Sequence, residues 1–265
     1  MLHVLRSELT RVAQRRLLLA WFGLTALFAI MVNTVMATVV TSTSMGDLPS
    51  PGVTFPTLAE LESPNGLVAG VSSAVNLLGV VTLSLWTILT AQDHSTGLIR
   101  LLVAAEPRRW RLLAGKAVAL TLMTALVALV AVVVNVMAAG PMLAAAGVDT
   151  SAWGQDVVAV LWSGWSNLFL ALVVWGVLGL LLATLTRSAA AAISIGVAYV
   201  LLVESLIRMA GGAPTDWLLG TTLGAIARGG SAAMAYGTAL TLGVGYVIVA
   251  LGIAGLVFAR RDVTE

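Results

Sequence analysis

The sequence predicts an all-α membrane protein with six transmembrane helices and both termini in the cytoplasm. Hydrophobic residues make up 59% of the 265-residue chain and charged residues only 10%, unlike the composition of soluble domains. A helix needs about 20 apolar residues to cross about 30 Å of hydrocarbon, and lipid offers backbone groups no other partner. The apolar stretches predict spans at residues 17–40, 67–91, 117–139, 157–185, 189–209 and 231–259, within one transmembrane domain, 1–265.

Residues 1–16 predict a short amphipathic elbow helix along the cytoplasmic interface. Its apolar positions repeat at helical spacing, and basic or polar residues fall on the other side: Leu2, Leu5, Leu9 and Val12 against Arg6, Arg11, Gln14 and Arg15. A frayed basic start is the alternative. The apolar run that follows is too long for a cleavable signal peptide, so we interpret it as the first span.

The positions of the basic residues predict the orientation. All but two of the 14 Lys and Arg residues fall at the termini or in alternate loops, and the remaining loops are mainly acidic. The positive-inside rule then places both termini in the cytoplasm, as six spans require. This bias also accounts for the basic cluster between spans 2 and 3, so we expect no nucleic-acid partner.

Several kinds of chemistry are excluded by what the sequence lacks. It has no cysteine, which removes disulfides, thiolate metal sites and cysteine nucleophiles. Its two histidines, His3 and His94, both fall on the cytoplasmic side, so no histidine site lies within the membrane. Gly115-Lys116 lacks the glycine spacing and the Ser or Thr of a phosphate-binding loop. We predict no catalytic, cofactor or metal site in this chain.

Polar and small residues within the spans have two interpretations. Asn33, Asn76, Asn135 and Asn167 place one amide in each of the first four spans. They could line a substrate path, although hydrogen bonding between helices is the commoner use of such residues. In the last span, the stripe Gly237, Thr241 and Gly245 predicts close helix packing.

Three features interrupt or border the later spans. Gly140-Pro141 is expected to end or kink the third span. Glu204 precedes Arg208 by one helical turn, which predicts an ion pair at the outer end of the fifth span. Residues 211–230 are too apolar for a plain loop and too short to cross the membrane. They predict an outer re-entrant segment of short helices before the last span, with an ordinary amphipathic loop as the alternative.

The coupling loop, residues 92–116, carries the most specific pattern. Leu98, Leu101, Leu102 and Ala105 follow helical spacing, which predicts a short cytoplasmic helix over 97–105 with one apolar face. Pro107 suits the first turn of the next helix. The apolar face needs a cover, either a partner protein or the lipid headgroups.

At this loop the chain resembles the permease subunits of ABC-2 type transporters, the type-2 ABC exporter family. Span number, orientation and an N-terminal elbow helix are similar over the whole chain, and the motif covers residues 93–116. There Asp93, where the family usually has Glu, is followed in order by Gly97, Arg100, Pro107, Arg108 or Arg109, and Lys116. Leu98 stands where the family usually has Thr.

The resemblance implies a permease of an ATP-driven exporter in the bacterial plasma membrane. ATP and Mg²⁺ would be bound by a separate ATP-binding subunit, two copies per complex, beside a second permease, identical or homologous. The substrate would be amphipathic: a drug, an antibiotic peptide or a lipid-like molecule. The alternative is a six-span secondary transporter or membrane scaffold that works without an ATPase. The residues implied in ATPase coupling are Asp93, Gly97, Leu98, Arg100, Leu101, Leu102, Ala105, Pro107, Arg108 and Arg109.

Overall fold

The computed structural model describes residues 2–41, 55–95, 109–210 and 215–260, and these residues form helices and no strands. In chain order the elements are α1 (Leu2–Val12), α2 (Arg15–Thr41), α3 (Leu58–Glu62), η1 (Pro64–Val68), α4 (Ala69–Ser73), α5 (Val75–Ser95), α7 (Arg109–Ala145), η2 (Ser151–Gly154), α8 (Val157–Thr186), α9 (Ala189–Ala198), η3 (Tyr199–Val203), α10 (Glu204–Ala210), α11 (Leu219–Arg228) and α12 (Tyr236–Arg260).

Five described helices are long and apolar enough to cross a membrane, which confirms the all-helical, multi-pass class. They cover Arg15–Val40, Val75–Asp93, Trp110–Ala145, Val157–Thr186 and Tyr236–Phe258. The predicted fifth span, 189–209, is divided among α9, the π-helical turn η3 and α10, which follow one another without a gap. It is therefore not one of the five.

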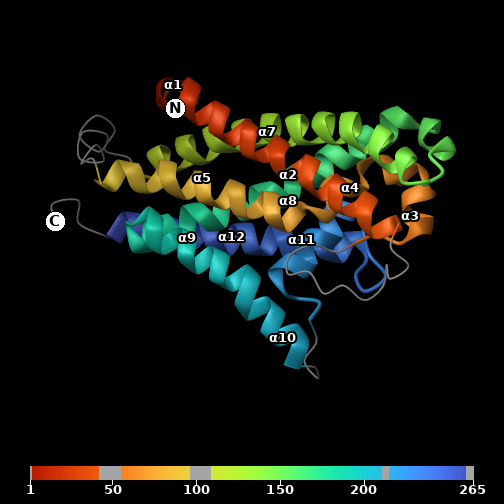
Figure 1. The fold of residues 1–265 in the computed structure, drawn as a ribbon. Helices are drawn as coiled ribbons and strands as arrows, with labels where there is room; N and C mark the ends of the chain where they lie inside the picture. The colour runs from red at the N-terminus through yellow and green to blue at the C-terminus, as the bar shows by residue number, and fades with distance from the viewer. Residues whose placement is uncertain (1, 42–54, 96–108, 211–214, 261–265) are drawn as a thin grey trace.

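Helices α5 and α8 form the centre of the bundle. Figure 1 shows α2 and α7 on one side of them and α9, α11 and α12 on the other, with both chain ends at the same end of the bundle. Most of the spanning window of α5 is buried by protein, whereas α12 is largely exposed. The exposed apolar side chains of α2, α7 and α12 are where a lipid-facing surface is expected.

The predicted second span does not start as one helix. Residues 64–74 form the 3₁₀ turn η1 and the short helix α4, and α5 begins only at Val75. Gly66 and Gly70 are buried, and a side chain on Gly70 would overlap the Asn135 amide. This segment is apolar because protein buries it, and a hydropathy pattern cannot distinguish that burial from burial in lipid.

The third predicted span is longer than expected. α7 passes through Pro141 and ends at Ala145, so Gly140-Pro141 does not end the helix, and a kink there stays a prediction. Both α5 and α7 also extend into the region predicted as the coupling loop 92–116. The turn between α8 and α9 is as short as predicted: Arg187 has a left-handed backbone, and the Ser188 hydroxyl accepts a hydrogen bond from the Ala191 N–H.

The segment before α12 holds one described helix, α11, and residues 211–214 lie outside the description. Most of α11 is buried, and it packs against α4, α5, α8 and α12. The stripe Gly237, Thr241 and Gly245 of α12 was predicted to allow close helix packing. Among the described residues, no other helix packs closely against its two glycines. A side chain on Gly237 or Gly245 would meet nothing within 4 Å.

Candidate functional site

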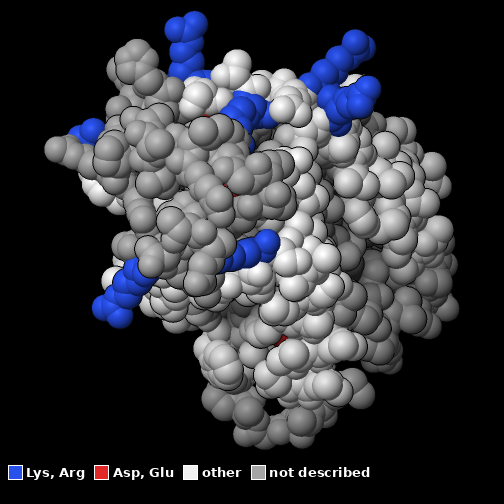
Figure 2. Space-filling view, turned by 90° about the vertical axis from the view of Figure 1, so that its left-hand side faces the viewer, with Lys and Arg blue, Asp and Glu red and all other residues white. Residues whose placement is uncertain are grey.

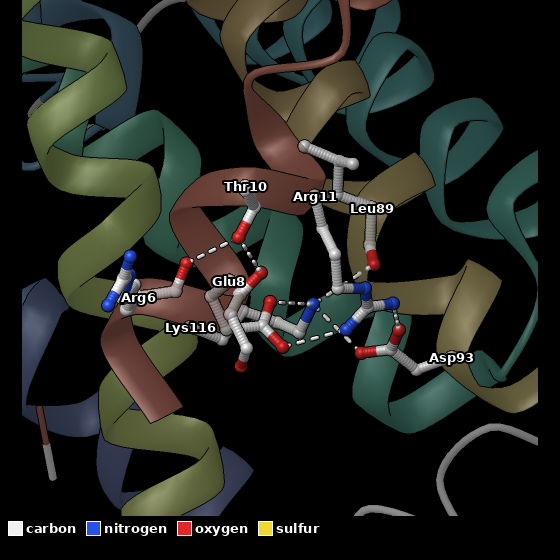
Figure 3. Close-up of polar contacts among 8 residues, drawn as sticks. Arg6, Glu8, Thr10, Arg11, Leu89, Asp93 and Lys116 are labelled. Carbon is white, nitrogen blue, oxygen red and sulfur yellow. Dashed lines mark hydrogen bonds and ion pairs between the residues drawn. The ribbon is translucent and has the colours of Figure 1, made fainter. Parts of the chain in front are cut away.

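Four charged side chains form a closed ring at the basic end of the bundle (Figure 3). Glu8 lies 2.7 Å from the Arg11 Nη1 and 2.9 Å from the Lys116 Nζ. Asp93 lies 2.8 Å from the Lys116 Nζ through one oxygen and pairs with the Arg11 guanidinium through the other. Each carboxylate therefore contacts both cations, and the ring has no net charge. We call Glu8, Arg11, Asp93 and Lys116 the charge ring.

The ring joins three elements that are distant in sequence. Glu8 and Arg11 come from α1, Asp93 from the last turn of α5, and Lys116 from the second turn of α7. Lys116 also donates to the Leu89 carbonyl, at 3.3 Å. The described helices that flank residues 96–108 are thus joined to each other and to the N-terminal helix.

The ring is largely withdrawn from solvent. Glu8, Asp93 and Lys116 are 4%, 3% and 7% exposed, a degree of burial that charged side chains tolerate only when they are paired. Burial alone would lower the pKa of Arg11. The hydrogen bond to Asp93 and the charges of Asp93 and Glu8 outweigh that effect and raise the pKa. The Arg11 cation is accordingly stabilised in place.

The surface around the ring is basic. Figure 2 faces this end of the molecule and shows Lys and Arg side chains projecting around the undescribed atoms. The exposed basic residues described at this end are Arg6, Arg15, Arg16, Arg187 and Arg260. The two acidic residues of the ring are buried, and their charges are neutralised by Arg11 and Lys116 inside the protein.

The sequence pattern indicates only part of this site. Asp93 was predicted as a coupling residue, and Lys116 was the last residue of the motif; the structure brings them together. Arg11 was placed on the outward side of the elbow helix, but its guanidinium turns inward to Asp93. Glu8 was missed. Its signal is its register, because it stands three residues after Leu5 and four before Val12, on the apolar face.

The other predicted coupling residues cannot be placed in the same way. Arg109 begins α7, but its side chain is not described. The rest lie in 96–108, outside the described residues: Gly97, Leu98, Arg100, Leu101, Leu102, Ala105, Pro107 and Arg108.

Three of the four asparagines of the spans make hydrogen bonds between elements. Asn33 donates to the Asn135 side chain and Asn135 to the Leu67 carbonyl, each at 2.8 Å. Asn167 accepts from the Tyr236 hydroxyl at 2.6 Å. The side-chain oxygen of Asn76 is buried without a hydrogen bond among the described residues. These contacts stabilise the bundle; a substrate path through them stays a prediction.

No metal site was found in the part of the chain that the structure describes: no group of three or more His, Cys, Asp or Glu side chains could hold an ion. The described carboxylates of the charge ring are already occupied by Arg11 and Lys116.

Comparison with known families places the sequence. Residues 26–264 match the family described as "Protein of unknown function (DUF2705)". This chain belongs to the DUF2705 family. A search of the curated proteins found no match.

The charge ring of this DUF2705 chain joins α1 to the ends of α5 and α7 that flank residues 96–108.

Proposed function

We propose that this chain is the permease subunit of an ATP-driven ABC exporter that moves an amphipathic substrate, such as a drug, an antibiotic peptide or a lipid-like molecule. A separate ATP-binding subunit, present in two copies, holds ATP and Mg²⁺. A second permease, identical or homologous, completes the complex in the bacterial plasma membrane. In this arrangement both termini are cytoplasmic, and α9, η3 and α10 together make the sixth crossing.

The charge ring is the observation that carries the proposal. The motif shared with ABC-2 permeases begins at Asp93 and ends at Lys116, and the side chains of these two residues lie 2.8 Å apart. The two ends of the segment between them therefore lie close together, and ion pairs with Glu8 and Arg11 join both ends to α1. A partner that pushed on a helix at 97–105 would act on the bases of two spans and on the elbow helix together.

The unbroken run of helical turns from α9 through η3 to α10 supports the sixth crossing. At 1.5 Å per residue it is long enough for about 30 Å of hydrocarbon. Several of its large side chains are apolar and well exposed in the isolated chain, as lipid-facing side chains are expected to be: Ile195, Leu202 and Leu206.

Copurification with an ATPase tests the proposal directly. The tagged chain should purify with an ATP-binding cassette protein from its own cells, and the complex should hydrolyse ATP. The chain alone should not bind ATP at micromolar concentration, because its sequence has no phosphate-binding loop. A chain that transports its substrate without an ATPase would be a secondary transporter, and this result would overturn the proposal.

Substitutions on the predicted apolar face make the test specific. Leu101→Asp or Leu102→Asp would bury a lone charge against the partner, which should cost about 3–5 kcal/mol of interface stability. The ATPase should then be lost on purification, while membrane insertion stays normal. Thr96→Asp adds the same charge to the same segment outside that face and is the matched control. If the leucine variants retain both the partner and transport, the segment lies on lipid instead.

A further inference from the structure

Glu204, the first residue of α10, holds the N-terminus of α11. Its side chain is completely buried. One carboxylate oxygen accepts a hydrogen bond from the Gly220 N–H at 3.2 Å, and the other accepts one from the Thr221 N–H at 3.1 Å. These N–H groups belong to the first turn of α11, where no intrahelical partner exists and where the helix dipole favours a negative charge.

The carboxylate fits closely against the helix. A side chain on Gly220 would come within 2.6 Å of one Glu204 oxygen and 2.9 Å of the other, so only glycine allows this approach. Two tyrosines add to the contact. The Tyr199 hydroxyl accepts from the Leu219 N–H at 3.5 Å, and the Tyr246 hydroxyl donates to the Trp217 carbonyl just before the helix.

The opposite end of α11 reaches the middle of the bundle. The Ser72 hydroxyl of α4 donates to the Ala227 carbonyl at 3.1 Å, and Gly229 ends the helix in a left-handed conformation. α11 therefore covers α4 and packs against α5 and α8, which form the centre of the fold. Moving α11 would uncover Ser72.

A π-helical turn lies directly before Glu204. The π-helical turn η3 separates α9 from α10, and such turns inside a helix frequently occur at functional sites. α9 packs against α5 and α8, whereas α10 leans away from the bundle (Figure 1). A change of angle at η3 would move the Glu204 carboxylate relative to α11 without disturbing α9.

We propose that Glu204 is the latch of a gate: while its carboxylate holds the N-terminus of α11, the helix covers the centre of the bundle, and bending at η3 releases it. This inference rests on the proposed transport function, in which α11 would close the outer end of the substrate path. Release leaves the N–H groups of Gly220 and Thr221 without the carboxylate, so the open state needs water at this site. The latch thus links opening to hydration of the path.

The absence of cysteine from the sequence allows a direct test in the full-length chain in lipid nanodiscs. Ser72→Cys reports on the position of α11 through its reaction rate with a water-soluble maleimide. Adding Glu204→Ala should raise that rate about tenfold or more, the factor expected when a charged hydrogen bond is lost. Gly220→Ala should do the same from the other side of the contact by forcing the carboxylate away.

Two controls separate release from general loss of structure. Gly224→Ala makes the same substitution one turn later in α11, where the new side chain meets only the flexible end of Arg228, at 3.4 Å; it should leave the rate unchanged. Thr124→Cys places the reporter at a fully buried position of α7, away from α11, and should stay unreactive in all variants.

An unchanged Ser72→Cys rate in both the Glu204→Ala and Gly220→Ala variants would overturn the latch. Equal gains at Ser72→Cys and Thr124→Cys in both variants would also overturn it, since they indicate unfolding. The assay needs neither ATP nor a partner. Failure to purify an ATPase would therefore count against the proposed function alone, and unchanged labelling against the latch alone.

Discussion

At the scale of single residues, the charge ring is a set of interactions in which no member can be removed alone without leaving another charge buried. Glu8 and Asp93 each contact both cations, and all the carboxylate oxygens are used. Breaking a buried pair by removing one partner is costly, whereas removing both partners costs much less. The ring is therefore expected to behave as a unit rather than as four separate contacts.

A double-mutant cycle checks this behaviour. Lys116→Met should lower the free energy of unfolding by about 3 kcal/mol, because two buried carboxylates would share Arg11 alone. Glu8→Gln in the same chain should recover part of that loss by restoring the balance of charge. Denaturant unfolding in detergent measures both. Arg16→Met, which removes an exposed cation outside the ring, should change little. Simple additivity of the Lys116 and Glu8 effects would contradict a coupled ring.

At the scale of helices, α5 and α8 form a close reciprocal contact. Trp86 of α5 lies on Gly176 of α8, and Trp175 of α8 lies on Gly79 of α5; a side chain at either glycine would overlap the facing ring. The Thr87 hydroxyl also donates to the Gly179 carbonyl at 3.1 Å. Small residues let two helices approach in lipid, where packing and hydrogen bonds replace the hydrophobic effect.

Alanine substitution at these glycines tests the contact. Gly79→Ala and Gly176→Ala should each destabilise the protein by about 1–3 kcal/mol, the usual cost of forcing extra volume into a packed interface. Thermal unfolding in the same detergent gives the comparison. Gly245→Ala on α12, where a new side chain meets nothing within 4 Å, should be close to neutral. Equal effects at all three positions would show that the α5 and α8 interface is loose.

At the scale of the whole molecule, the charges separate toward the two ends of the bundle. Exposed Lys and Arg side chains project from one end (Figure 2), while Glu60, Asp149 and Asp156 are exposed in the turns at the other. Cytoplasmic loops carry the excess of Lys and Arg in membrane proteins. We therefore expect the end with the charge ring to face the cytoplasm.

Single cysteines in intact cells test that orientation and the sixth crossing together. An impermeant maleimide should label cysteines that replace Thr150 and Asp216, and it should leave one that replaces Ser188 unlabelled until the cells are opened. The separation arises because α9, η3 and α10 would carry the chain from Ser188 to the outer face. Strong labelling at position 188 in intact cells, or protection at position 216, would contradict six crossings.

Much of the element plan can be read from hydropathy, because long apolar stretches in lipid have few alternatives to the helix. α2, α8 and α12 lie close to the predicted spans. The break at residues 64–74 could not be predicted in this way. Hydropathy sums local character, and a residue buried by α7 and α11 has the same local character as one buried by lipid.

The candidate site also has a part that the sequence predicts and a part that only packing determines. A motif pointed to Asp93 and Lys116, but their meeting with Glu8 and Arg11 depends on how α1 packs, and Glu8 lies 108 residues from Lys116 in the chain. Glu204 was expected to pair with Arg208, whose side chain is not described. In the structure the Glu204 carboxylate accepts a hydrogen bond from the Gly220 N–H at the start of α11. Local pattern predicts which segments form helices. Charge pairing and capping between distant helices depend on the approach of their ends, which only the packed bundle sets.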